Sequence, residues 1–261
     1  MAAAQLLFDV EGPVACLTFN RPDARNALTW EMYDGLVAAC DRVDGADGVR
    51  VLVLRGAGGR AFAAGTDIGQ FAAFASREDA IAYERRLDAV IDRLERVGAA
   101  TIAQVQGAAT GGGCAIALAC DLRVFTTNGR LGVPVARTLG NCLSAANYAR
   151  MIDLLGPARA KDLLITGRLM EPAEALAAGL ATSVVDPADI DATVRGLADA
   201  IAANAPLTIR AAKEAIRRIQ ESRRPPAGAI DDLIEACYLS ADFREGVAAF
   251  LARRAPRFTG R

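Results

Sequence analysis

One segment in the first half of the chain combines a strand pattern, a glycine run and a helix pattern. The stretch Thr101–Cys114 runs from a β-branched apolar segment through three consecutive glycines into the alanine-rich run Ala115–Cys120. Glycines at such a turn leave the first N–H groups of the helix approachable, and the helix dipole adds partial positive charge there. The segment is therefore a candidate for holding an oxyanion.

A second segment has the same character. The apolar run Val51–Arg55 has the pattern of a buried strand, and a glycine-rich loop and the segment Phe62–Ile68 follow it. Two such turns could aim two amide donors at one oxygen atom, as chemistry on a thioester or a similar carbonyl requires. A glycine run after a strand is also typical of an ordinary tight turn, so the turns alone leave both interpretations open.

Short motifs along the rest of the chain resolve this ambiguity. They are Asn20–Leu28, Ala63–Asp67, Gly107–Cys114, Ala119–Arg123, Asp242–Gly246 and Arg253–Phe258. Their residues and their order resemble the enoyl-CoA hydratase/isomerase (crotonase) family over nearly the whole chain. The resemblance implies an α/β fold, a crotonase-like spiral of ββα units with two nearly perpendicular sheets. It also implies a spiral core over residues 1–205, a C-terminal helical trimerisation module over residues 206–261, and a homotrimer or dimer of trimers.

The same resemblance implies the ligand and part of the site. Family members bind acyl-CoA as substrate, with no separate cofactor, and stabilise the thioester enolate with two backbone amides, which fall here on Thr66 and Gly112. The residues expected to contact the CoA thioester are Ala24, Asn26, Ala64, Asp67 and Ile68. For the side chain of Asn26 the alternative is a structural cap of its own loop. Asp67 is expected to cap the first turn of a helix.

Two positions that carry glutamates in enoyl-CoA hydratases carry none here. The first is Ala115, and the second falls on Val135 after Pro134, or on Ala136 if a one-residue length difference is placed elsewhere. A positioned acid or base contributes roughly 10²–10⁴-fold to a rate, and an oxyanion donor roughly 10²–10³-fold. The chain keeps the donors and lacks the acids, which argues against efficient water addition by the two-glutamate route.

Other polar side chains near the expected pocket are candidates for catalysis. Glu84 and Asp88 lie on a helix predicted over about residues 78–97, for which the alternative is a solvated polar flank. Arg137, Thr138 and Asn141 follow the second missing acid. Arg137 or Asn141 could bind a second carboxylate or steer a decarboxylation, so a malonyl-type acyl-CoA is an alternative substrate class.

Three functions therefore stay open at this point. The chain is a hydratase or isomerase by similarity, an enzyme with another enolate reaction such as decarboxylation or thioester hydrolysis, or an acyl-CoA binder without catalysis. The missing acids weaken only the first of these.

Composition excludes several other classes of site. The chain has no histidine, which removes Ser-His and Cys-His pairs and most zinc sites, and no metal site is expected. The six cysteines show no Cys-x-x-Cys pairing and are expected to be reduced, mostly buried thiols. Cys114, at a helix start, is a place where the pKa of a thiol can be lowered, although a packing role is expected there.

Charge and hydropathy bear on partners and location. The net charge of −1 argues against broad nucleic-acid binding. The chain contains no run of 18 uncharged apolar residues, and residues 1–5 lack the features of a signal peptide, so we expect no membrane insertion and a cytoplasmic protein.

Periodicity and caps predict the main elements. Strands are expected over residues 14–19, 51–55 and 122–125. A helix is expected after an N-cap at Thr29, and further helices from about residues 144, 158, 172, 190 and 206.

Overall fold

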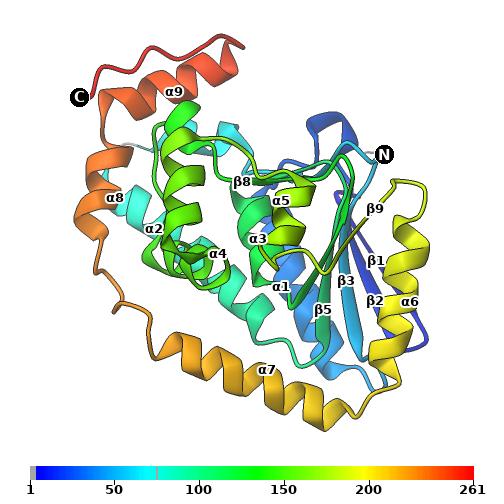
Figure 1. Ribbon diagram of the computed structural model, residues 1–261. Helices are drawn as coiled ribbons and strands as arrows, with labels where there is room; N and C mark the ends of the chain where they lie inside the picture. Colours follow the sequence, from blue (N-terminus) through cyan, green and yellow to red (C-terminus); the bar gives the residue numbers. More distant parts are fainter. Residues whose placement is uncertain (1–3, 75) are drawn as a thin grey trace.

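A six-stranded sheet forms the centre of the molecule. The computed structural model describes residues 4–74 and 76–261 (Figure 1). The strands are β1 (Leu6–Glu11), β2 (Val14–Phe19), β3 (Val51–Gly56), β5 (Ala100–Val105), β7 (Leu122–Thr126) and β9 (Ser183–Val185), in the spatial order β1-β2-β3-β5-β7-β9. The β1–β2 pair is antiparallel and the other pairs are parallel. All six residues of β5 are buried, as expected for a parallel strand covered on both faces.

The molecule has a second sheet of three short strands, which alternate along the sequence with strands of the first sheet. It consists of β4 (Ala61–Ala64), β6 (Ala108–Thr110) and β8 (Arg130–Gly132), paired in parallel in that order. Three strands of the large sheet, β3, β5 and β7, are each followed by a strand of the small sheet. The next long helices are then α2 (Arg77–Glu95), α3 (Gly112–Ala119) and α4 (Ala145–Thr166), respectively. The expected α/β spiral of ββα units is therefore confirmed.

Helices cover both faces of the large sheet. On one face, α1 (Trp30–Gly45), α2 and α3 enclose the main core, which contains Phe19, Leu54 and Phe62. On the other face, α6 (Ile190–Ala202) packs through Val194 on a smaller core of valine and isoleucine side chains. The shorter helices are η1 (Pro22–Ala24), η2 (Ile68–Ala73), η3 (Val135–Arg137) and α5 (Pro172–Ala177).

Local signals place the helix ends as expected. The side chain of Thr29 accepts a hydrogen bond from the Met32 N–H and caps α1, and Ser144 caps α4 in the same way. The helices predicted from about residues 144 and 158 are the two halves of α4, which bends at Gly156 (φ 72°).

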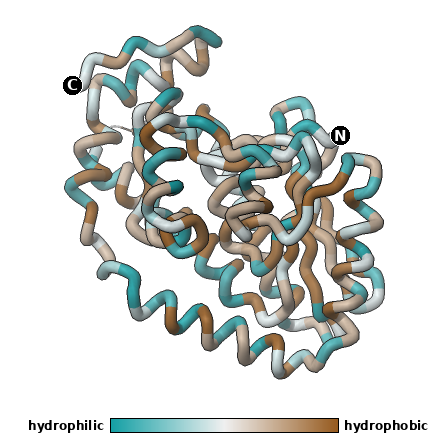
Figure 2. Tube along the Cα trace, in the orientation of Figure 1, coloured by the Kyte–Doolittle hydropathy of each residue, from teal (hydrophilic) through white to brown (hydrophobic). Residues whose placement is uncertain are grey.

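The C-terminal helices are α7 (Pro206–Glu221), α8 (Asp231–Tyr238) and α9 (Ala241–Leu251). In Figure 1, α7 runs along the lower edge of the molecule, and apolar and polar residues alternate along it in Figure 2. Leu207, Ile216 and Ile219 are exposed there. The chain then returns, so that α8 packs on α2 and α9 on η2. The division at residues 205 and 206 and the trimerisation role stay predictions.

Within residues 4–74 and 76–261, no helix is both long enough and apolar enough to cross a bilayer.

Candidate active site

Two loops leave neighbouring strands of the small sheet side by side. Because β4 and β6 are parallel and pair at their last residues, the loops that follow begin at the same edge. Gly65 (φ 87°) and Gly111 (φ 52°) open these loops in the left-handed region that glycine tolerates. A Cβ atom built on Gly111 would lie 3.4 Å from the Cα atom of Gly65, so the two main chains are close. This approach brings the next residues, Thr66 and Gly112, together.

The backbone N–H groups of Thr66 and Gly112 have no acceptor among the residues that the structure describes. The backbone groups of the neighbouring residues, in contrast, form hydrogen bonds within the protein. The Leu28 N–H donates to the Gly65 carbonyl at 2.8 Å, and the Asp67 N–H donates to the Leu28 carbonyl at 2.8 Å. Gly112 opens α3, where the first N–H groups have no intrahelical partner. Two donors in adjoining turns are thus available to an acceptor.

Two tyrosines hold the side chain of Thr66. Its Oγ1 atom lies 2.8 Å from the hydroxyl of Tyr33 and 2.8 Å from the hydroxyl of Tyr83, and all three residues are buried. Burial raises the pKa of both phenols, so both stay neutral near pH 7. A Cβ atom on Gly112 would overlap the Tyr33 hydroxyl, so Tyr33 leaves room only for glycine there.

Glu84 is buried in a second cluster from the same helix as Tyr83. The Tyr238 hydroxyl donates to Glu84 Oε1 at 2.5 Å, and the Asn141 amide donates to the Tyr238 hydroxyl at 3.0 Å. Glu84 is 3% exposed. Burial raises the pKa of Glu84 to about 8, the Tyr238 hydrogen bond opposes this rise, and the charge of Asp88 adds to it. The interpretation of Glu84 as part of a solvated flank is wrong, because this part of α2 lies beneath α8.

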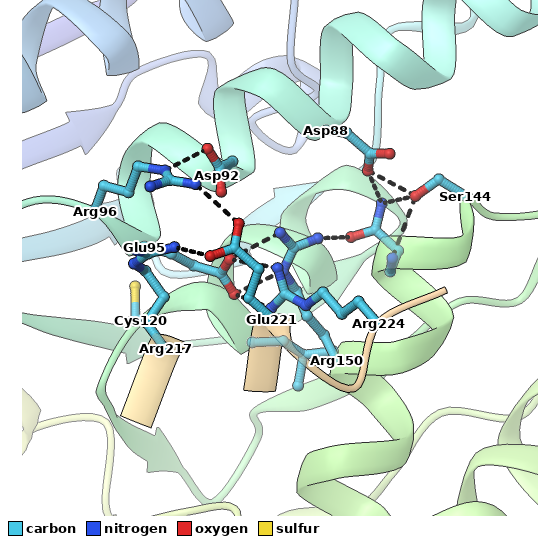
Figure 3. Close-up of polar contacts among 12 residues, drawn as sticks. Asp88, Asp92, Glu95, Arg96, Cys120, Ser144, Arg150, Arg217, Glu221 and Arg224 are labelled. Carbon is cyan, nitrogen blue, oxygen red and sulfur yellow. Dashed lines mark hydrogen bonds and ion pairs between the residues drawn. The ribbon is translucent and has the colours of Figure 1, made fainter. Parts of the chain in front are cut away.

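Asp88, one turn after Glu84, begins a polar network that continues toward the C-terminal end of α2 (Figure 3). It accepts a hydrogen bond from the Ser144 hydroxyl at 2.6 Å, and burial raises the pKa of Asp88. Further along, Glu95 pairs with Arg150 at 2.7 Å and with Arg224 at 3.1 Å, and all three are largely buried. Burial alone would raise the pKa of Glu95, but the two guanidinium groups hold it below its usual value. The network fastens the segment after α7 to α2 and α4.

Known proteins share this architecture. The sequence model of the enoyl-CoA hydratase/isomerase family matches residues 9–261. The chain belongs to the enoyl-CoA hydratase/isomerase family. A probable enoyl-CoA hydratase of Mycobacterium tuberculosis is 32% identical over 100% of both chains, and a crotonyl-CoA hydratase of Syntrophomonas wolfei is 31% identical over 99% of both.

Solved structures of the family fit the chain closely. An enoyl-CoA hydratase/carnitine racemase from Magnetospirillum magneticum is 34% identical, with a TM-score of 0.80, over 100% of this chain and 97% of that one. Methylmalonyl-CoA decarboxylase in complex with 2-nitronate-propionyl-CoA is 25% identical, with a TM-score of 0.90, over 100% of both chains. Proteins similar to this chain are thus named for more than one reaction.

The two positions expected to carry acids in hydratases of the family are apolar here. Ala115 is buried in the first turn of α3. Val135 opens η3 after Pro134, and the exposed Ala136 follows it. A carboxylate for this site must therefore come from another element.

The residues expected to contact CoA lie where the turn after η1 meets the end of β4 and the start of η2. They are Ala24, Asn26, Ala64, Asp67 and Ile68. The Ala64 N–H donates to the Arg25 carbonyl at 3.1 Å, which joins the turn after η1 to β4. The amide of Asn26 is fully buried, donates to the carbonyls of Ala57 and Ala61, and accepts from the Arg21 N–H. The side chain of Asn26 thus stabilises its own loop, which is the alternative to a CoA contact given in the sequence analysis.

Asp67 has the capping geometry expected of it. Its Oδ1 atom accepts from the Gly69 N–H at 3.2 Å at the start of η2, and its Oδ2 atom pairs with Arg21 at 3.0 Å. Ile68, the first residue of η2, is buried.

The three candidates that follow the second missing acid, Arg137, Thr138 and Asn141, lie in different environments. Asn141 joins the Glu84 cluster. Thr138 donates to the Pro134 carbonyl at 2.9 Å. Arg137 is exposed, and its guanidinium group forms no hydrogen bond or ion pair with another described residue.

The cysteines are free thiols in all six positions. Cys114 is fully buried, as the expected packing role requires, and burial raises the pKa of its thiol to about 12. The thiol with a lowered pKa, about 7, is Cys237, which has a hydrogen bond with Cys142.

Sequence reasoning missed Tyr33, Tyr83 and Tyr238. The chain contains only four tyrosines, and three of them meet around Thr66 and Glu84. For Tyr83 a signal was present, because it lies four residues before Leu87 on the apolar face of α2.

Proposed function

We propose that this protein binds an acyl-CoA thioester and stabilises its enolate between the backbone N–H groups of Thr66 and Gly112. The observation that carries the proposal is the pair of unoccupied donors in adjoining turns. A thioester oxygen that gains negative charge would accept two hydrogen bonds, each worth roughly 10²–10³-fold in rate. The names of the relatives support acyl-CoA as the substrate class.

The reaction that these residues fit best is proton transfer along the acyl chain, as in an enoyl-CoA isomerase. Hydration by the two-glutamate route uses an acid and a base, which Ala115 and Val135 do not supply. Isomerisation moves one proton between carbon atoms, so a single acid–base group near the enolate is enough.

Decarboxylation of a carboxylated acyl-CoA is the second candidate. It is favoured by the TM-score of 0.90 to methylmalonyl-CoA decarboxylase over the full length of both chains. Loss of CO₂ leaves the electron pair on the enolate, so the step needs the two amide donors but no base. A proton is needed only afterwards.

The test removes the N–H donor of Gly112. Alanine at Gly112 keeps the N–H group and proline removes it, while Tyr33→Phe clears room for the Cβ atom that both side chains add. We would therefore compare Tyr33→Phe/Gly112→Pro with Tyr33→Phe/Gly112→Ala. Crotonyl-CoA, a 3-enoyl-CoA and methylmalonyl-CoA are the substrates, with products followed by mass spectrometry. We expect the proline variant to lose roughly 10²–10³-fold in turnover of one substrate class relative to the alanine variant.

Two results would contradict the proposal. Equal turnover by the proline and alanine variants would mean that the Gly112 amide holds no negative charge. Tight binding of the CoA esters by the wild type, with no turnover of any of them, would identify an acyl-CoA binder.

We also propose that the protein is a homotrimer or a dimer of trimers in which α7 is buried. The exposed apolar side chains of Leu207, Ile216 and Ile219 support this arrangement. Light scattering after size exclusion measures the mass, and Ile216→Glu is expected to lower it. A monomeric wild type would refute the assembly.

A further inference from the structure

The hydrogen bonds around Glu84 decide where its proton lies. The amide of Asn141 donates to the Tyr238 hydroxyl, so the single proton of that hydroxyl is directed at Glu84 Oε1. Oε1 is therefore an acceptor in both protonation states of Glu84. When the carboxyl is neutral, its proton lies on Oε2, a buried atom with no hydrogen-bond partner among the described residues. This proton is free to be given to a ligand.

Glu84 is linked to the side chain of Thr66 through the tyrosines. Tyr83 directly precedes Glu84 on α2, and the hydroxyls of Tyr83 and Tyr33 both bond to Thr66 Oγ1. Burial raises the pKa of both phenols, and the charge of Glu84 adds to the rise. The ring of Tyr83 lies 6.1 Å from that of Tyr238, which holds the carboxyl. One aromatic cluster thus joins the side chain of Thr66, next to the candidate enolate donors, to Glu84.

A polar cavity connects Glu84 with the outer surface. It has a volume of about 400 Å³ and lies between α2, the start of α4 and the segment between α7 and α8. Besides Glu84, the charged groups that line it are Arg85, Asp88, Glu221, Arg224 and Asp231. Water in such a polar cavity can carry protons between the solvent and the carboxyl group.

We propose that Glu84 is the proton-transfer group of this site, in place of the two glutamates of the hydratases. This inference rests on the proposed enolate function. The enolate double bond supplies the electron pair for a new C–H bond, the proton comes from Glu84 Oε2, and the thioester carbonyl re-forms. The carboxylate that remains takes a proton from the polar cavity. In the reverse direction, ionised Glu84 removes the proton from the carbon next to the thioester.

The experiment measures this proton transfer alone. Butyryl-CoA has no double bond and no carboxylate to lose, so deuterium uptake from D₂O next to its thioester reports enolate formation only. We expect Glu84→Gln to lower the exchange rate by roughly 10²–10⁴-fold while the Kd for butyryl-CoA changes little. Glu78→Gln is the matched control, since it makes the same change at an exposed position of α2. It should exchange at the wild-type rate.

The pH profile separates catalysis from a structural role. Exchange by ionised Glu84 rises with pH up to about pH 8 in the wild type. Tyr238→Phe removes a hydrogen bond that lowers the pKa of Glu84, so the profile should move to higher pH. Tyr238→Phe also keeps the test decisive if Glu84→Gln fails to fold.

The outcomes distinguish this inference from the function on which it rests. Exchange that requires the Gly112 amide but survives in Glu84→Gln, or an unmoved profile in Tyr238→Phe, overturns the role of Glu84 alone. A wild type that exchanges no deuterium overturns the enolate function and this inference together.

Discussion

The contact between Gly112 and Tyr33 gives the sharpest test of the site's packing. In Gly112→Ala the new methyl carbon would overlap the Tyr33 hydroxyl oxygen. The next nearest atoms, Tyr33 Cζ and Thr66 Oγ1, are each 3.4 Å away, which is an ordinary contact. Overpacking of this kind costs about 1–3 kcal/mol. The backbone of Gly112 has no positive φ and needs no glycine for conformational reasons, so the hydroxyl alone causes the cost.

Tyr33→Phe should therefore rescue Gly112→Ala. The single Tyr33→Phe change costs about 0.5–1.5 kcal/mol, since Thr66 keeps its bond to Tyr83. In that background Gly112→Ala should be neutral or stabilising by up to about 1 kcal/mol. Urea unfolding of the four proteins at one fixed concentration gives the coupling energy, expected at about 1–3 kcal/mol. If Gly112→Ala costs the same in both backgrounds, the reasoning is refuted.

Three further predictions concern charge and reactivity. The pKa of Glu84 is about 8 in the folded protein and 4.5 for an ordinary carboxyl. The raised value therefore contributes fully to the stability of the folded state below pH 4.5, where Glu84 is protonated. That contribution, up to about 5 kcal/mol, is lost as the pH rises through 8. Urea unfolding across pH should show this slope in the wild type but not in Glu84→Gln. Glu95→Gln leaves Arg150 buried without its carboxylate partner and should cost about 3–5 kcal/mol. Adding Arg150→Met should recover most of that loss in the same assay; a further loss would contradict the argument. Iodoacetamide at pH 7.5 should alkylate Cys237 before Cys114, because their pKa values are about 7 and about 12. Peptide mapping that finds Cys114 modified first in the folded protein would show that burial does not protect it.

Local sequence patterns were sufficient for much of the framework. The features predicted in this way each depend on a few neighbouring residues. They are the apolar run at Val51, the cap at Thr29, the helix start near Ser144 and the glycines around Thr66 and Gly112. Such features follow from propensity and backbone geometry, so they can be predicted without tertiary contacts.

The acid–base part of the site could not be found in this way. Glu84 lies three residues before Leu87, at the border of the apolar face of α2, where its charge favoured a solvated position. It is buried because Tyr238, 154 residues away, packs over it from α8. A contact over that separation leaves no local pattern, and the raised pKa exists only once the contact is made.

The two candidate donors are main-chain groups, and this has a consequence for how such proteins diverge. A substitution at Thr66 changes a side chain but leaves the N–H group in place, because the path of the chain after β4 and β6 positions it. Point mutations can thus change the side chains around this site without moving the main-chain N–H groups. The backbone site that holds negative charge can thus be kept while the reaction changes. Similar proteins named as a hydratase and as a decarboxylase can therefore share one backbone.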